Sequence, residues 1–194
     1  MVSVESMGKC LAKIYYHWSA YTLSALYQTQ KIVDCIYDNN NETKKQLLLR
    51  LIKFCEENGG GINGDDTEHQ YVQQQYPNCM FKTENYSRNN GLIAISESGM
   101  QDLQSWSEGD VTINLDDDTI GFGVCWWHES ISEYNEARRE WDDDFDSLTI
   151  DEVPDIGYDL CNFSVDDLDA VSEAIDAVGG NVVRYGNNIF ELIE

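Results

Sequence analysis

VTINLDDDTIGFGVCWW, residues 111–127, is the clearest hairpin pattern in this chain. Val111–Leu115 alternates apolar and polar residues, which is typical of a strand with one buried face. The polar turn Asp116–Asp118 follows, and Gly121–Trp127 is a second run of strand-forming residues. This stretch therefore predicts a β-hairpin that carries three carboxylates at its turn.

Helical and strand patterns alternate on the C-terminal side of this hairpin. Ile131–Trp141 has helical spacing, with Tyr134 and Trp141 expected to face inward. A second helix is predicted over 164–178, because a serine followed three residues later by an aspartate fits a capping arrangement. The residues 182–193 are expected to form a terminal hairpin around a glycine-containing turn.

The N-terminal side contains one predicted strand and two predicted helices. Gly8–Trp18 is rich in apolar and aromatic residues and is expected to be a strand. A helix that begins at Ser19 or Thr22 should follow, and a second helix is predicted over Glu42–Asn58. The residues expected to be buried in these helices are Leu26, Val33, Ile36, Tyr37, Leu47, Leu48, Leu51, Ile52 and Cys55. Strands and helices in this order predict an α+β fold.

The middle of the chain resembles a winged helix-turn-helix. Asp66–Tyr76 is expected to be a short helix, and Cys79–Lys82 and Gly91–Ile95 two short strands. LIAISESGMQDL, residues 92–103, resembles the wing-to-helix segment of winged-helix regulators. This resemblance implies an alternative function, direct DNA binding. The basic residues that would carry it are Lys44, Lys45, Lys53 and Arg88.

The strong negative charge of the chain is confined to one region. The net charge is −24 over 194 residues, but residues 1–60 are nearly neutral, while Glu108–Asp176 holds 22 acidic and two basic residues. We therefore divide the chain into a near-neutral α/β region, 1–107, and a strongly acidic α+β region, 108–194, which can also form one continuous domain. Aromatic residues are frequent among the acids, so the acidic region should fold.

This charge density approaches that of duplex DNA. A compact unit of 69 residues is about 28 Å across. Over that length DNA carries about 17 phosphate charges, at about 1.7 Å per charge. The acidic region therefore predicts a basic, nucleic-acid-binding protein as partner, and it disfavours direct binding to nucleic acid or to an anionic membrane.

The candidate partner-binding residues are the acidic clusters and one tryptophan. Trp127 is the expected aromatic anchor, since an exposed aromatic within a charged patch is a typical interface residue. The full set is Asp116, Asp117, Asp118, Trp127, Glu129, Glu133, Glu136, Glu140, Asp142, Asp143, Asp144, Asp146, Asp151, Glu152 and Asp155.

No catalytic residue, metal ligand or cofactor site is predicted. An EF-hand-like frame that begins at Asp142 has Ser147 where glycine is needed and Val153 where a bidentate glutamate belongs. Cys125 and His128 form a single pair, whereas structural zinc needs four ligands. A carboxylate-rich metal-dependent enzyme remains an alternative to a binding protein.

In charge and size the chain resembles phage-encoded acidic inhibitors, the DNA-mimic proteins that block restriction enzymes or CRISPR nucleases. The resemblance implies an inhibitor that covers the DNA-binding surface of a host defence nuclease. Scattered cysteines agree with a reduced cytoplasm, here that of a bacterial host cell. AKIYYHWSAYT, residues 12–22, also resembles small phage and bacterial proteins with a Tyr-x-His-Trp-Asp-Gly-Tyr-Pro signature, a group that implies no chemistry.

Overall fold

The protein has an α+β fold built on two sheets, as the sequence predicts. The computed structural model describes residues 1–17, 22–38, 42–63, 74, 86–124 and 126–192. In this part of the chain seven strands form a mixed main sheet in the order β3-β4-β2-β1-β5-β6-β8. These strands are β1 (Val2–Ser6), β2 (Lys9–Tyr15), β3 (Gly61–Ile62), β4 (Leu92–Ala94), β5 (Gly109–Asn114), β6 (Thr119–Val124) and β8 (Phe163–Ser164).

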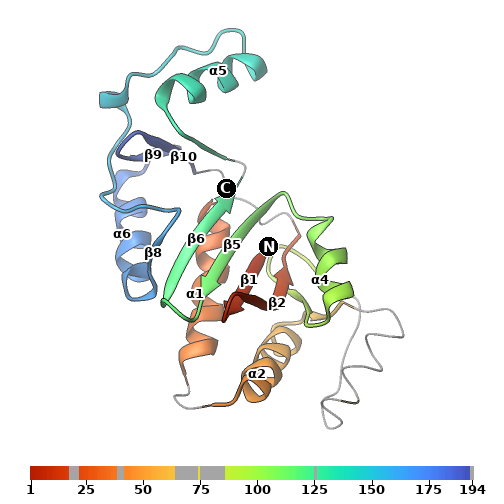
Figure 1. The fold of residues 1–194 in the computed structure, drawn as a ribbon. Helices are drawn as coiled ribbons and strands as arrows, with labels where there is room; N and C mark the ends of the chain where they lie inside the picture. Colours follow the sequence, from red (N-terminus) through yellow and green to blue (C-terminus); the bar gives the residue numbers. More distant parts are fainter. Residues whose placement is uncertain (18–21, 39–41, 64–73, 75–85, 125, 193–194) are drawn as a thin grey trace.

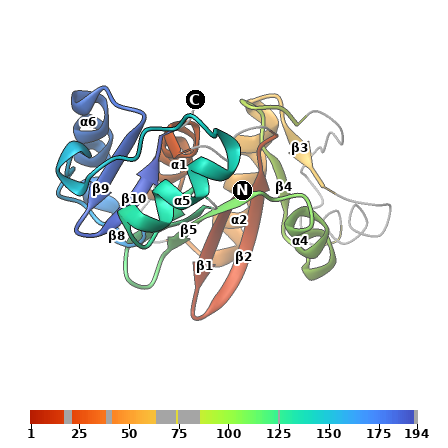
Figure 2. The ribbon, with the colours of Figure 1, turned by 90° about the horizontal axis from the view of Figure 1, so that it is seen from above.

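A smaller antiparallel sheet stands beside the main sheet. Its described strands have the order β7-β10-β9. They are β7 (Trp127–His128), β9 (Val182–Tyr185) and β10 (Asn188–Glu191). Strands β9 and β10 form the predicted terminal hairpin, in which Asn188 lies opposite Tyr185. Figure 2 shows this second sheet and α6 (Leu168–Val178) at one end of the molecule, with β3, β4 and α4 (Glu97–Gln104) at the other.

The predicted hairpin lies within the main sheet, between β1 and the edge strand β8. β5 and β6 pair antiparallel, with Val111 opposite Phe122. β5 also pairs in parallel with β1, where Val2 lies opposite Val111. Strands from before and after residue 107 therefore share one sheet. β1 was not expected, although Val2 and Val4 alternate with serine in the way that identifies a half-buried strand.

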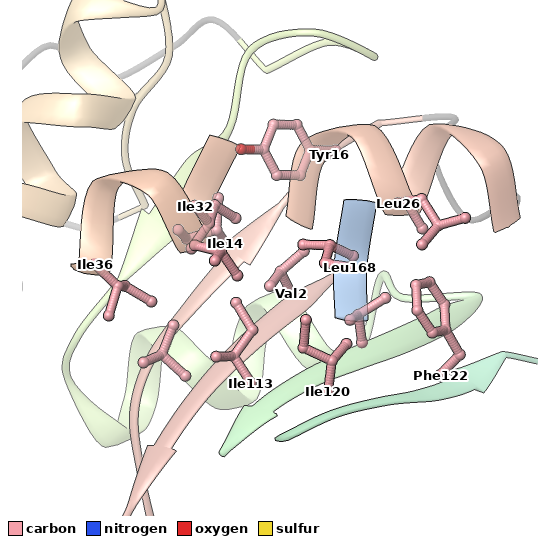
Figure 3. Close-up of a cluster of buried hydrophobic side chains, with 14 of the residues drawn as sticks. Val2, Ile14, Tyr16, Leu26, Ile32, Ile36, Ile113, Ile120, Phe122 and Leu168 are labelled. Atoms are coloured by element: carbon pink, nitrogen blue, oxygen red, sulfur yellow. The ribbon is translucent and has the colours of Figure 1, made fainter. Parts of the chain in front are cut away.

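Among the described elements, three helices cover one face of the main sheet, and one covers the other. Side chains of α1 (Thr22–Tyr37), α2 (Lys44–Glu57) and α6 pack in a single hydrophobic cluster with alternate residues of the strands. Figure 3 shows Leu26, Ile32 and Ile36 of α1 above Ile113 and Ile120 of the sheet. On the opposite face, Leu103 of α4 packs in a separate cluster that includes Tyr15, Leu92 and Ala94.

Local sequence signals placed the helix ends well. Thr43 and Gln46 form a capping box at the start of α2, and the five residues predicted to be buried in this helix are buried. Ser96 caps α4 by accepting a hydrogen bond from the backbone N–H of Gly99. Gly179 ends α6 in the left-handed conformation (φ 56°) that glycine adopts without strain.

The middle segment differs from a winged helix. β4 is an interior strand that pairs with β2 on one side and β3 on the other, whereas a wing is a hairpin at the edge of a small sheet. The predicted strand Cys79–Lys82 lies outside the described residues, as does almost all of the predicted helix Asp66–Tyr76. Within the described part of the chain, no helix is both long and apolar enough to cross a bilayer.

Helix α5 (Ile131–Trp141) packs on the second sheet instead of the main sheet. Tyr134 is buried there with Val153 and Ile189 in a third hydrophobic cluster. The sequence expectation that Trp141 also faces inward is wrong, because its side chain is 84% exposed. Trp141 lies two turns beyond Tyr134, about 10 Å along the helix, and Phe145 folds back to pack edge-on against Tyr134, with ring centroids 5.9 Å apart.

Candidate acidic interaction surface

The structure divides the predicted interface residues into two groups at opposite ends of strand β6. Asp116, Asp117 and Asp118, which we call the turn cluster, lie in the β5–β6 turn. The larger group, which we call the α5 surface, lies on α5 and the chain around it. Its predicted members are Glu129, Glu133, Glu136, Glu140, Asp142, Asp143, Asp144, Asp146, Asp151 and Glu152.

The two groups do not form one continuous cluster. A strand as long as β6 spans about 20 Å at about 3.3 Å per residue. Figure 1 shows α5 at the top of the molecule and the β5–β6 turn at the lower end of these strands. Because ten of the fourteen predicted carboxylates belong to the α5 surface, it is the stronger candidate for partner binding.

Side chains of the turn cluster have structural roles. The carboxylate of Asp116 accepts hydrogen bonds from the hydroxyl of Ser6 (3.0 Å) and from the backbone N–H of Met7, and so holds the β1–β2 turn. Asp118 accepts a 2.6 Å hydrogen bond from the hydroxyl of Tyr37. Burial raises the pKa of Tyr37 well above its usual range, and the bond to Asp118 adds to the shift. These carboxylates are therefore partly engaged within the chain.

A cavity of about 360 Å³ lies beside the turn cluster. Tyr37, Val33 and Leu168 contribute to its walls, together with the carboxylates of Asp118, Asp166 and Asp169. Asp166 lies just before α6, and Asp169 lies in its first turn. Neither was among the predicted interface residues. The sequence signal for them is a cluster of acids at the start of the predicted helix 164–178.

The glutamates of the α5 surface form a stripe along one side of the helix. Glu129, Glu133, Glu136 and Glu140 are all exposed, and helical spacing of three or four residues places neighbours on the same side. Glu133 also accepts a hydrogen bond from the backbone N–H of Glu129 (2.8 Å). Like charges at this spacing destabilise a helix, so the stripe lowers the stability of α5.

The segment that follows α5, residues 142–148, is an ordered loop that we call the acidic loop. Asn135 is 7% exposed. Its side-chain amide forms hydrogen bonds with both the backbone N–H and the backbone carbonyl of Leu148. Its Nδ2 donates to the Leu148 carbonyl (2.7 Å), and its Oδ1 accepts from the Leu148 N–H (2.9 Å). Arg139 donates to the hydroxyl of Ser147 (2.6 Å). The aspartates at 142, 143, 144 and 146 are exposed, on a backbone tied to α5 at both ends.

A buried ionic group fixes α5 to the second sheet. Glu191 of β10 is 4% exposed. Its carboxylate lies 3.0 Å from Nε2 of His128 in β7 and 3.3 Å from a guanidinium nitrogen of Arg138 in α5. A hydrogen bond with Tyr134 and the attraction of Glu191 raise the pKa of Arg138. Three elements are therefore joined beneath the α5 surface.

The predicted acids in or beside the short 3-10 helix Ile150–Glu152 include Glu152, a member of the α5 surface, and Asp155, which belongs to neither group. Glu152 accepts hydrogen bonds from both the backbone N–H (2.7 Å) and the hydroxyl (2.8 Å) of Thr149. These bonds lower the pKa of Glu152. Asp155 pairs with Arg184 (2.9 Å). Because its charge is already compensated, Asp155 is the predicted residue least suited to bind a partner.

The exposed aromatic residue of this region is Trp141, not Trp127. Trp127 is partly buried and stacks on Phe190, with ring centroids 6.4 Å apart. Trp126 is also partly buried and packs against the main cluster. Periodicity alone places Trp141 on the same side of α5 as Tyr134, and no local pattern indicates that Phe145 packs against Tyr134 instead.

The charges at the end of α5 are unfavourable for the helix itself. The carbonyl end of a helix attracts cations and repels anions. Arg138 and Arg139 in the last turn follow this preference, but Glu140 and the aspartates of the acidic loop oppose it. Repulsion among these carboxylates adds to the cost. A positive partner would reverse both effects.

The described residues of the N-terminal half do not form the basic face that a DNA-binding regulator needs. Lys44, Lys45 and Lys53 are exposed on α2. The groove between α1 and α2, however, contains Lys31, Arg50 and Lys53 together with Asp34, Asp38 and Glu57. Arg88 donates to the hydroxyl of Ser24 (2.7 Å). Positive and negative charges are therefore interleaved on this side of the molecule.

Among the described residues, no three His, Cys, Asp or Glu side chains lie close enough together to hold a metal ion. No protein-family model, curated protein or solved structure matches the chain. The functional argument therefore depends on the chain's own geometry and charge.

Proposed function

We propose that this protein is an inhibitor that binds the basic nucleic-acid-binding surface of another protein and blocks DNA from it. The partner class that the charge resemblance implies is a nuclease of a bacterial defence system, of the CRISPR or restriction type. The acidic face that makes the contact is the α5 surface. The protein acts by occupying the partner's site and needs no reaction chemistry of its own.

The observation that carries this proposal is the order of the acidic loop. An acidic tail that only solubilises a protein needs no fixed backbone. Here Asn135, Arg139 and Phe145 hold the loop against α5. A preorganised set of charges loses less conformational entropy on binding than a flexible one. The geometry therefore favours recognition over simple solvation.

The chemistry of recognition follows from the partner's own ligand. A protein that binds DNA holds phosphate oxygens with arginine and lysine side chains. Carboxylates pair with the same cations through short, charge-assisted hydrogen bonds. Many such charges also attract the partner over a distance of about 10 Å, the screening length at moderate salt, and so accelerate association. Affinity should fall as salt rises.

A pair of matched variants tests the proposal. The test variant neutralises four exposed carboxylates of the α5 surface: Glu136→Gln, Glu140→Gln, Asp143→Asn and Asp146→Asn. The control variant removes the same charge from the α6 region: Asp166→Asn, Asp169→Asn, Glu173→Gln and Asp176→Asn. All eight positions are exposed, and each replacement keeps the side-chain shape.

The readout is recovery of nucleases from a defence-competent bacterial lysate, followed by affinity measurement with the purified nuclease. Exposed ion pairs contribute about 0.2–1 kcal/mol each, so neutralising four carboxylates should weaken binding by about 4- to 1000-fold. The control variant should retain wild-type affinity within about threefold. Equal losses in the two variants would show that net charge alone acts, and unchanged binding by a folded test variant would refute the proposal.

A further inference from the structure

Trp141 has the most exposed aromatic side chain among the residues that the structure describes. It is 84% exposed, whereas Tyr27, the next, is 59% exposed. A single exposed tryptophan is unremarkable on an ordinary surface. Trp141, however, ends α5 between Glu140 and Asp142 and directly precedes the acidic loop. Its indole ring is thus the apolar element of a strongly negative surface.

The cations near Trp141 in the sequence are already engaged. Arg138 pairs with Glu191, and Arg139 donates to Ser147. In the described part of the chain, a cation lies over an aromatic ring at Tyr27, where Lys31 is 4.3 Å from the ring centroid, and no such contact is present at Trp141. A helical side chain lies over the preceding turn, where Ala137 contributes only a methyl group. The indole ring therefore remains accessible to a cation from another molecule.

Arginine is the side chain that fits this combination of groups. A guanidinium is planar and weakly hydrated, so it stacks on an indole face while its N–H groups point outward to carboxylates. Tryptophan is also the aromatic residue that attracts cations most strongly. Lysine carries one compact, strongly hydrated charge and cannot stack on the ring and bind two carboxylates at once.

We propose that Trp141 anchors an arginine side chain of the partner and makes the α5 surface select arginine over lysine. This inference rests on the proposed function and extends it, since it names the residue type that the partner must present. The partner's DNA-binding surface should then contain an arginine that contacts phosphate when DNA is bound.

Two peptides of equal length, one of arginine and one of lysine, test this inference in calorimetric titrations at low ionic strength. The variants are Trp141→Leu, which keeps apolar area without a π face, and Trp141→Phe, which keeps a weaker π face. Trp106→Leu is the matched control, because Trp106 is 40% exposed in the near-neutral region. High exposure at residue 141 means that both replacements there should leave folding intact.

The expected result concerns the arginine peptide alone. Trp141→Leu should weaken its binding about two- to fivefold, the size of an exposed cation–π contact, and should leave lysine-peptide binding unchanged. Trp141→Phe should lie between, and Trp106→Leu should equal wild type. Equal weakening for both peptides, or no weakening for either, would overturn the arginine anchor and leave the proposed function standing. Failure of wild type to bind either peptide would overturn both.

Discussion

Replacing Asn135 with alanine should unfold the acidic loop without removing any negative charge. The variant removes two hydrogen bonds, the 2.7 Å bond to the Leu148 carbonyl and the 2.9 Å bond from the Leu148 N–H. Each bond contributes about 1 kcal/mol, and a backbone group left buried without a partner costs about 1–3 kcal/mol. Since Leu148 is partly buried, we expect a loss of about 2–4 kcal/mol in the free energy of unfolding.

Urea denaturation measures the global effect, and hydrogen exchange measures the local one. Amide protection at residues 142–150 should fall, while α1 and the main sheet should keep their protection. Asn162→Ala is the control, because this exposed side chain should contribute less than about 0.5 kcal/mol. A loss below about 1 kcal/mol, or full protection of the loop in the variant, would refute the view that Asn135 orders it. Partner affinity should fall as well, since charge without order loses preorganisation.

Three further predictions concern other parts of the fold. Met7→Gly should raise the free energy of unfolding by about 1 kcal/mol in urea denaturation. Met7 has a φ of 51°, a left-handed conformation that costs a non-glycine residue about this much, and its side chain is 82% exposed. A destabilised variant would contradict this. Glu191→Gln should cost about 1–3 kcal/mol, because it removes the carboxylate paired with Arg138 and weakens the bond to His128. An unchanged denaturation midpoint would show that the ionic group is dispensable. Tyr37, whose pKa is raised in the folded state, should favour folding below its unfolded pKa of about 10 and lose that contribution as the pH rises further. In a spectrophotometric titration of the folded protein, wild type and Tyr37→Phe should therefore match near a pH of about 10, and one additional phenol that ionises there in wild type would contradict this.

Local patterns in the sequence predicted the individual elements more reliably than their packing. The alternation in Val111–Leu115 identified β5, and helical spacing identified α2 and α5, because these signals depend on neighbouring residues alone. The parallel pairing of β1 with β5 joins residues more than a hundred positions apart. No local pattern encodes such a pairing, so the common sheet of the two regions was not foreseen.

The candidate surface shows the same division between composition and geometry. The sequence identified the acids, because charge is a property of composition. It did not separate the turn cluster from the α5 surface, since that depends on β6 as a spacer between them. The sequence analysis chose Trp127 as the exposed aromatic residue, whereas the structure exposes Trp141. This difference depends on Phe145, which packs against Tyr134 because the acidic loop folds back onto α5.

Competition between this protein and DNA tests the central claim most directly. A nuclease recovered by the wild-type protein is mixed with a fluorescent duplex, and the protein is added while anisotropy and complex size are recorded. The account predicts that the duplex is released in proportion to added protein, and that the variant neutralised at Glu136, Glu140, Asp143 and Asp146 releases it only at much higher concentration. A stable ternary complex of nuclease, duplex and protein would contradict it.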